Sequence, residues 1–276
     1  MNEEKIAMLK ERAKQLRKTA VTMIYEAQSG HPGGSLSAAD MVAALYFSEM
    51  HIDPQNPNWA DRDRFVLSKG HVCPILYSAL GILGYFPESV LHTLRQEGSM
   101  LQGHPSMVKC PGIDISTGSL GQGAACAVGM ALAGKRDGKD YRVFTMVGDG
   151  EIDEGIVWEA MMCANKYKLD NYIMLFDNNG LQLDGTTDQI MPGLDMSKKA
   201  ADFGFDVYEI DGHDMEQILD TFDKIRAAKN GKPKFINAHT VKGKGVYYME
   251  NSLDWHGKAP NKEQYESAME QLERGI

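Results

Sequence analysis

The sequence predicts an α/β fold with a doubly wound parallel sheet flanked by helices. Short apolar segments rich in β-branched residues alternate with longer segments whose apolar residues recur at three- and four-residue steps. Such alternation is typical of strand–helix–strand units, whose right-handed crossovers lay the strands side by side and parallel. No internal repeat, charge block or linker-like stretch divides the 276 residues, so a single domain, residues 1–276, is expected.

The first third of the chain is predicted to be mostly helical. Residues 3–28 form a long helix, because their apolar residues fall on one face. A proline and three glycines in segment 29–34 end it, since the residue before a proline disfavours helical geometry. Ser37 is the expected N-cap of a second helix that ends near Met50. A short apolar strand at 64–68 follows, and after it another helix.

The rest of the chain alternates more clearly between strands and helices. Apolar runs with β-branched and aromatic residues predict strands at 142–147, 172–176, 205–210 and 235–238. Periodic segments predict helices at 154–167, 215–228 and 261–274. Strands that alternate with helices in this way belong to a parallel sheet that is buried on both faces.

Composition and charge exclude several classes of partner. With 43% hydrophobic and 24% charged residues the chain is globular rather than disordered or fibrous. A net charge of −9 leaves no basic surplus to neutralise the phosphates of a nucleic acid. The longest small or apolar run, 124–134, is shorter than the roughly 20 residues that span a bilayer. We therefore expect neither a nucleic-acid nor a membrane partner.

The N-terminus and the cysteines predict a cytoplasmic protein. Charged residues occupy positions 3–5, where a signal peptide would begin its apolar core. The cysteines lie far apart without a Cys-x-x-Cys pair, and we expect reduced thiols packed as small hydrophobic side chains. They are Cys73, Cys110, Cys126 and Cys163.

Two loops that leave predicted strands carry the chemistry of a metal-bridged diphosphate site. Gly148-Asp149-Gly150 follows one strand, where the glycines permit a close approach and the carboxylate is a hard oxygen ligand. Asn178 and Asn179 follow the next strand, 27 residues further on, and offer amide oxygens. In open parallel sheets, ligands bind outside the carboxyl ends of the strands. Either loop alone fits an ordinary turn equally well; the pair together favours the site.

These loops and their flanking motifs resemble the thiamine diphosphate fingerprint of the transketolase family. Seven segments occur in the order of that family, so the resemblance covers nearly the whole chain. They are SGHPG at 29–33, LSKGH at 67–71, GHP at 103–105, TGSLGQG at 117–123, GDG at 148–150 with Glu154-Gly155, DNN at 177–179 and WHG at 255–257.

The resemblance implies a thiamine diphosphate site with a divalent metal. Asp149 and Asn179 would hold Mg²⁺ or Ca²⁺ together with the backbone carbonyl of Leu181. Gly148 and Gly150 would let the chain pass close to the diphosphate.

Four further residues match positions around the cofactor. His71 would contact a phosphate oxygen, and Gly118 and Leu120 would border the aminopyrimidine. Glu154 matches an acidic residue in a network across the subunit interface of the family.

The resemblance also implies three catalytic histidines: His31, His104 and His256. They would line the substrate channel, bind sugar hydroxyls and move protons. Imidazole suits such a channel, because it can both donate and accept a proton near neutral pH. The remaining histidines stand in contexts without a motif and are expected to be structural or on the surface. They are His51, His92, His213 and His239.

Three other features favour a simpler interpretation. The glycine cluster at 118–123 has the spacing G-x-x-G-x-G and follows a poor strand, which disfavours a dinucleotide loop. Glu151 and its acidic neighbours are expected at a helix N-terminus for reasons of charge alone. Lys242 and Lys244 predict a mobile basic loop, which either meets an anionic substrate or is merely solvated.

The resemblance is restricted to the first domain of full-length transketolases. Their second domain supplies the glutamate that activates the aminopyrimidine, the pocket for that ring and the basic residues that grip the sugar phosphate. We therefore expect the chain alone to be inactive. It resembles the N-terminal subunit of a split transketolase, completed by a separate C-terminal subunit in an α2β2 assembly. The implied reaction transfers a two-carbon ketol unit from a ketose phosphate to an aldose phosphate, as in the pentose phosphate pathway.

Two alternatives remain open at this stage. A subunit similar to 1-deoxyxylulose-phosphate synthase or to a ketoacid dehydrogenase would share the two metal loops but decarboxylate a ketoacid. A non-catalytic thiamine diphosphate binding module would need no channel histidines. The donor sugar is also open, and a sulfonated or branched sugar fits the sequence equally well.

Overall fold

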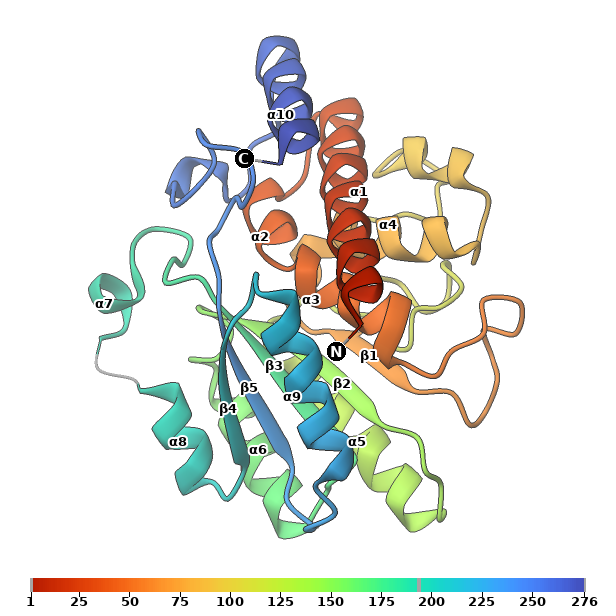
Figure 1. Ribbon diagram of the computed structural model, residues 1–276, viewed down its shortest axis with the longest axis vertical. Helices are drawn as coiled ribbons and strands as arrows, with labels where there is room; N and C mark the ends of the chain where they lie inside the picture. The colour runs from red at the N-terminus through yellow and green to blue at the C-terminus, as the bar shows by residue number, and fades with distance from the viewer. Residues whose placement is uncertain (1, 193–194, 276) are drawn as a thin grey trace.

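The computed structural model describes residues 2–192 and 195–275 and contains one five-stranded parallel sheet (Figure 1). The strand order is β1-β2-β3-β5-β4, which confirms the predicted doubly wound α/β class. The strands are β1 (Arg64–Leu67), β2 (Val143–Gly148), β3 (Tyr172–Asn178), β4 (Asp206–Asp211) and β5 (Lys234–His239). Each overlaps a strand that the sequence predicts.

Helices cover both faces of the sheet. The α-helices of the described chain are α1 (Glu3–Ala27), α2 (Pro32–Ser37), α3 (Ala39–Ala44), α4 (Cys73–Leu83), α5 (Gln122–Arg136), α6 (Gly155–Lys166), α7 (Thr187–Ile190), α8 (Met196–Asp202), α9 (Met215–Ala227) and α10 (Lys262–Arg274). Shorter turns are the π-helical η1 (Leu45–Glu49) and the 3₁₀ segments η2 (Gly70–Val72), η3 (Glu88–Thr93) and η4 (Leu253–Trp255). In the described part of the chain, no helix is both long and apolar enough to cross a bilayer.

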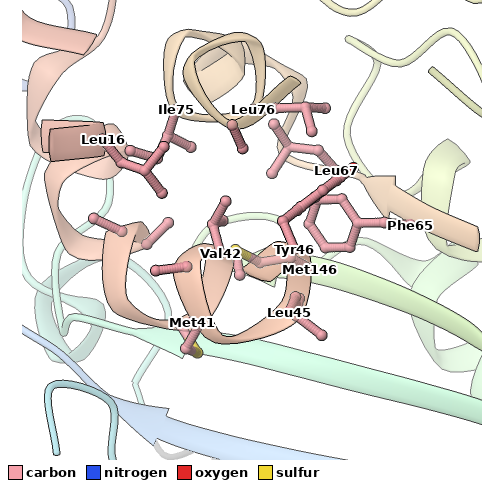
Figure 2. Close-up of a cluster of buried hydrophobic side chains, with 14 of the residues drawn as sticks. Leu16, Met41, Val42, Leu45, Tyr46, Phe65, Leu67, Ile75, Leu76 and Met146 are labelled. Carbon is pink, nitrogen blue, oxygen red and sulfur yellow. The ribbon is translucent and has the colours of Figure 1, made fainter. Parts of the chain in front are cut away.

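Successive strand residues enter two different cores. Phe144 and Met146 of β2 pack with α1, α3, α4 and α9, whereas Val143 and Val147 pack with α5, α6 and α8. Figure 2 shows part of the first core, where Met146 lies with side chains of α1, α3, α4 and β1. Both faces of the sheet are thus buried, and polar groups gather instead at the strand ends.

The start of the second helix is predicted wrongly. A short helix, α2, already begins at Pro32, because proline lacks the N–H that the first turn leaves unpaired and has a helical φ. The helical segment that ends near Met50 begins at Ala39 with Ala38 as its N-cap, so Ser37 does not cap it. Ser37 is the last residue of α2, fully buried, and its hydroxyl donates to a carboxylate oxygen of Asp177 at 2.6 Å. This contact ties α2 to the end of β3.

The sequence did not predict α5, α7 or α8. α5 is built largely of alanine and glycine, so its buried and exposed faces differ little in polarity and leave no clear 3.6-residue pattern. α7 and α8 are too short for a periodic signal. The predicted helices 154–167, 215–228 and 261–274 correspond to α6, α9 and α10.

Candidate active site

One cavity of about 300 Å³ lies where loops leave the carboxyl ends of β1, β2, β3 and β5. Most of the predicted site residues line it, although they come from distant segments of the chain. They are His31, His71, Gly118, Leu120, Gly148, Asp149, Gly150, Asn179 and His256.

Asp149 lies at the floor of this cavity, directly after β2. Its carboxylate accepts backbone N–H groups of Asn179 at 3.0 Å and Gly180 at 3.1 Å. The side chain is buried, and within the described residues it forms no ion pair. Burial, and then the negative charge of Asp177, raise the pKa of Asp149 to about 7. A cation beside Asp149 would therefore restore its ionised form.

The other two predicted metal donors lie next to Asp149 in the loop that follows β3. The side-chain oxygen of Asn179 accepts the N–H of Leu181 at 3.3 Å. The Leu181 carbonyl lies 3.4 Å from the amino nitrogen of Lys242. Among the described residues there is no cluster of three His, Cys, Asp or Glu side chains that could hold a metal. The predicted set is of another kind, with one carboxylate, one amide and one carbonyl.

A buried ion pair borders the cavity, and the sequence did not assign it a role. The ammonium of Lys69, after β1, pairs with the carboxylate of Asp177 in β3. Ser37 and Thr240 donate to the same carboxylate from α2 and from the end of β5. Asp177 therefore connects α2 with the segments that follow β1 and β5. Both side chains lie within sequence motifs, LSKGH at 67–71 and DNN at 177–179, and this is the signal that could have found them.

Glu151 joins a second set of loops, and its predicted role is wrong. Its carboxylate accepts the Ser68 hydroxyl at 2.6 Å and the backbone N–H groups of Gly121 at 2.8 Å and Gly148 at 3.4 Å. α6 begins only at Gly155, so Glu151 does not serve that helix N-terminus. Burial raises the pKa of Glu151 to about 7. Glu151 is thus a buried residue that holds the segments at Ser68, Gly121 and Gly148 together.

Three of the predicted histidines form a cluster over the cavity. The ring centroids of His31, His71 and His256 lie 5.0 to 5.4 Å apart. Burial is the main cause that lowers the pKa of both His31 and His256 to about 4. The next cause is the charge of Arg95 for His31 and the charge of Lys242 for His256. It also brings the pKa of His71 well below its usual value. At neutral pH all three are uncharged, so each ring offers one donor and one acceptor.

His104 and Glu154 lie at the edge of this arrangement rather than in the cavity lining. Gly118 has a φ of +153°, which favours glycine, and a Cβ there would come 3.2 Å from the His104 ring. Burial and Arg95 lower the pKa of His104. Glu154 is exposed and precedes α6 as its N-cap, without a capping hydrogen bond from its side chain.

Lys242 is buried. Of the two interpretations of its loop that the sequence left open, the one in which the lysine is merely solvated is therefore wrong. Its ammonium donates to the Gln182 carbonyl at 3.0 Å and lies 3.0 Å from Nδ1 of His256. Burial, and then the charge of Lys69, lower the pKa of Lys242 to about 8. Two lysines thus face the cavity.

The thiols are only partly as expected. All four are free, and Cys73 and Cys110 are buried. Cys126 on α5 is exposed and Cys163 is half-buried, because α5 and α6 present these positions outward.

The chain is similar to known proteins of one family. Residues 8–273 match the family described as "Transketolase, thiamine diphosphate binding domain". One subunit of the apulose-4-phosphate transketolase of Phocaeicola vulgatus is 44% identical over 94% of this chain and 92% of that protein. 6-Deoxy-6-sulfo-D-fructose transketolase subunit SqwG of a Clostridium species is 44% identical over 99% of both.

Solved transketolases share the fold over part of their length. The transketolase of Campylobacter jejuni is 36% identical with a TM-score of 0.92, covering 99% of this chain and 43% of that chain. That of Leishmania mexicana is 33% identical with a TM-score of 0.91, covering 96% of this chain and 41% of that chain. The present chain therefore spans about two fifths of each of these structures.

Proposed function

The chain belongs to the transketolase family, and from this premise we propose that it forms the thiamine diphosphate half of a two-subunit transketolase. The proposed reaction moves a two-carbon ketol unit from a ketose phosphate to an aldose phosphate. The observation that carries this proposal is the cluster of three uncharged imidazoles beside Asp149 in one cavity. A site that only binds a diphosphate would have no need of that cluster.

The donor set fits a diphosphate with a divalent cation. Asp149, Asn179 and the Leu181 carbonyl would hold Mg²⁺ or Ca²⁺, since hard cations prefer oxygen ligands. The raised pKa of Asp149 supports this, because burial leaves its charge without compensation in the described chain. Lys69 and Lys242 would balance the negative diphosphate. When bound, thiamine diphosphate would supply the carbon centre that carries the ketol unit.

The chain's own histidines would bind the sugar and move its protons. Nδ1 of His31 is buried and has no hydrogen-bond partner among the described residues, so Nε2 is the ring atom that would meet a sugar hydroxyl. His256 is held by Lys242 through its own Nδ1, which leaves Nε2 for substrate. His71 would face a phosphate oxygen, and His104 would line the channel mouth. Glu154 would contact the partner subunit, as its exposure permits.

The partner is proposed to be a C-terminal transketolase subunit. Two relatives that match this chain over nearly their whole length are named as subunits of transketolases. The solved transketolases continue well beyond the matched part. We propose an α2β2 assembly whose active sites lie between the two kinds of subunit, in the cytoplasm, where its four free thiols stay reduced.

Native mass spectrometry tests the assembly. The protein is taken from its own cells with Mg²⁺ and thiamine diphosphate present, and the intact complex is weighed. A complex with a second polypeptide and two cofactors supports the proposal and identifies the partner. A homodimer without a partner contradicts it.

A donor screen with the reconstituted complex tests the reaction. Ketose phosphates, a sulfonated ketose and a branched ketose phosphate are compared with pyruvate, because the named relatives act on sugars of such different kinds. Ketol transfer from any of the sugars supports the proposal and decides whether the pathway is that of the pentose phosphates. Decarboxylation of pyruvate with no ketol transfer contradicts it.

A further inference from the structure

A largely buried polar triad, Arg17, Asp40 and His213, lies outside the residues assigned to the cavity so far. Arg17 of α1 forms an ion pair with Asp40 of α3, and Asp40 accepts a hydrogen bond from Nδ1 of His213 at 2.8 Å. Although burial alone would raise it, Arg17 and the His213 hydrogen bond lower the pKa of Asp40 to about 2. Arg17 also donates to the Leu36 carbonyl in α2 at 3.1 Å.

The far side of the His213 ring reaches the loop that carries Lys242. The backbone N–H of Val241 donates to Nε2 of His213 at 2.9 Å. Since Nε2 accepts there, the proton of a neutral ring must sit on Nδ1, facing Asp40. The carboxylate and the backbone N–H thus select one tautomer and one ring orientation, in the manner in which an Asp–His pair is fixed in many enzymes.

The same loop is held at two further points. The Gly243 N–H donates to the Gly33 carbonyl at 2.9 Å, and the Lys242 carbonyl accepts the Asn251 N–H at 2.9 Å. Gly33 also makes room for the Lys242 stem, because a Cβ there would come 3.0 Å from Lys242 Cγ. His213 provides the hydrogen bond immediately before Lys242, on the side nearest the sheet.

We propose that His213, oriented by Asp40 and Arg17, is a positioning residue that fixes the backbone at Val241 and so aims the Lys242 ammonium into the cavity. The inference rests on the proposed function, in which Lys242 faces the diphosphate. It differs from a purely structural role for the triad, because the Nε2 contact acts on the Lys242 loop directly, whereas the Nδ1 contact orients the ring and joins it to α3.

Two substitutions separate these roles, because each retains one of the two contacts. The amide nitrogen of asparagine falls near the Nδ1 position, so His213→Asn keeps a donor to Asp40 and loses the acceptor for Val241. The amide oxygen of glutamine falls near the Nε2 position, so His213→Gln keeps that acceptor and loses the donor to Asp40. Both remove the ring.

The readouts need no cofactor. Labelling of Lys242 by an amine reagent, located by mass spectrometry, is expected to be about ten-fold faster in His213→Asn than in wild type, and closer to the wild-type rate in His213→Gln, which keeps the Val241 contact. Amide exchange over 241–243 should rise in parallel. Lys234, buried and paired with Asp206, serves as the reference lysine that does not change. The proposal is overturned if Lys242 is labelled equally fast in both variants, or if it is labelled in His213→Asn at the wild-type rate.

Nitrogen NMR of the full wild-type chain gives a test that does not depend on folding of a variant. The proposal requires the Nδ1–H tautomer of His213, and an Nε2–H tautomer overturns it. The proposed function fails in a different way: Lys242→Ala would then bind thiamine diphosphate with Mg²⁺ as tightly as wild type, whatever the labelling rates show.

Discussion

The two ends of the parallel sheet both bury carboxylates, but they treat them differently. At the amino ends, Glu49 pairs with Arg142 and Arg226, and Asp63 pairs with Arg142 at 2.7 Å. Asp63 also accepts two backbone N–H groups, at 2.7 and 3.0 Å. At the carboxyl ends, Asp149 accepts only backbone N–H groups, and no described cation lies within ion-pair distance of it.

The difference separates a structural network from a binding site. Burying a charge is costly unless it is paired, and the amino-end network satisfies this condition within the chain. At the carboxyl ends Lys69 compensates Asp177 within the chain, but Asp149 has no such cation among the described residues, and burial raises its pKa to about 7. The end with the uncompensated Asp149 is the one at which parallel sheets bind ligands.

The largest effect is expected from breaking the amino-end network. Arg142→Leu leaves Glu49 and Asp63 without their shared partner and should lower the free energy of unfolding by about 3–5 kcal/mol. Chemical denaturation measures it. Cofactor affinity of the folded fraction should stay at the wild-type value, and a matching loss of affinity would contradict the separation of the two ends.

Asp149→Asn should have the opposite signature. Binding of thiamine diphosphate with Mg²⁺ is expected to weaken by at least about a hundred-fold, since a proposed ligand of the metal is lost. Calorimetric titration of the complex measures it, with Asp170→Asn at the amino end as the control. Wild-type affinity in the Asp149 variant would refute the assignment of this site.

Asp149→Asn also tests the pH dependence of the free energy of unfolding in the cofactor-free chain. The folded pKa of Asp149, about 7, is above its unfolded value, so between about pH 4 and 7 the folded state holds a proton that the unfolded state has lost. Wild type therefore loses stability relative to Asp149→Asn as pH rises, by about 2 kcal/mol from pH 5 to pH 8. Denaturation at both pH values checks the difference, and a constant difference would show that Asp149 is not perturbed.

The smallest effect concerns the rim of the carboxyl-end cavity. His104→Ala should reduce kcat/KM for the sugar donor by about ten-fold, because a partly exposed ring contributes about one hydrogen bond. Thiamine diphosphate affinity should remain unchanged. Steady-state kinetics and titration on the same preparation test this, and a loss confined to cofactor affinity would move His104 from the channel to the cofactor site.

The residues predicted for the site lie in short contiguous sequence motifs. The Gly148-Asp149-Gly150 turn and the asparagines after β3 are contiguous motifs, so their chemistry is visible without coordinates. Glu151 and Lys242 were misjudged or left undecided because burial decides their role, and burial depends on segments far away in the chain. The partner of Glu151 is Ser68, 83 residues earlier, and that of His213 is Asp40, 173 residues earlier.

The sequence by itself determined the α/β class, the strand positions and the resemblance to transketolase, because periodicity, turn residues and motifs are local properties of the chain. The tertiary structure decided the strand order, the start of α2, the clustering of three imidazoles and which carboxylates carry compensating charge. These depend on desolvation and on contacts between distant segments, and both exist only after the chain has folded.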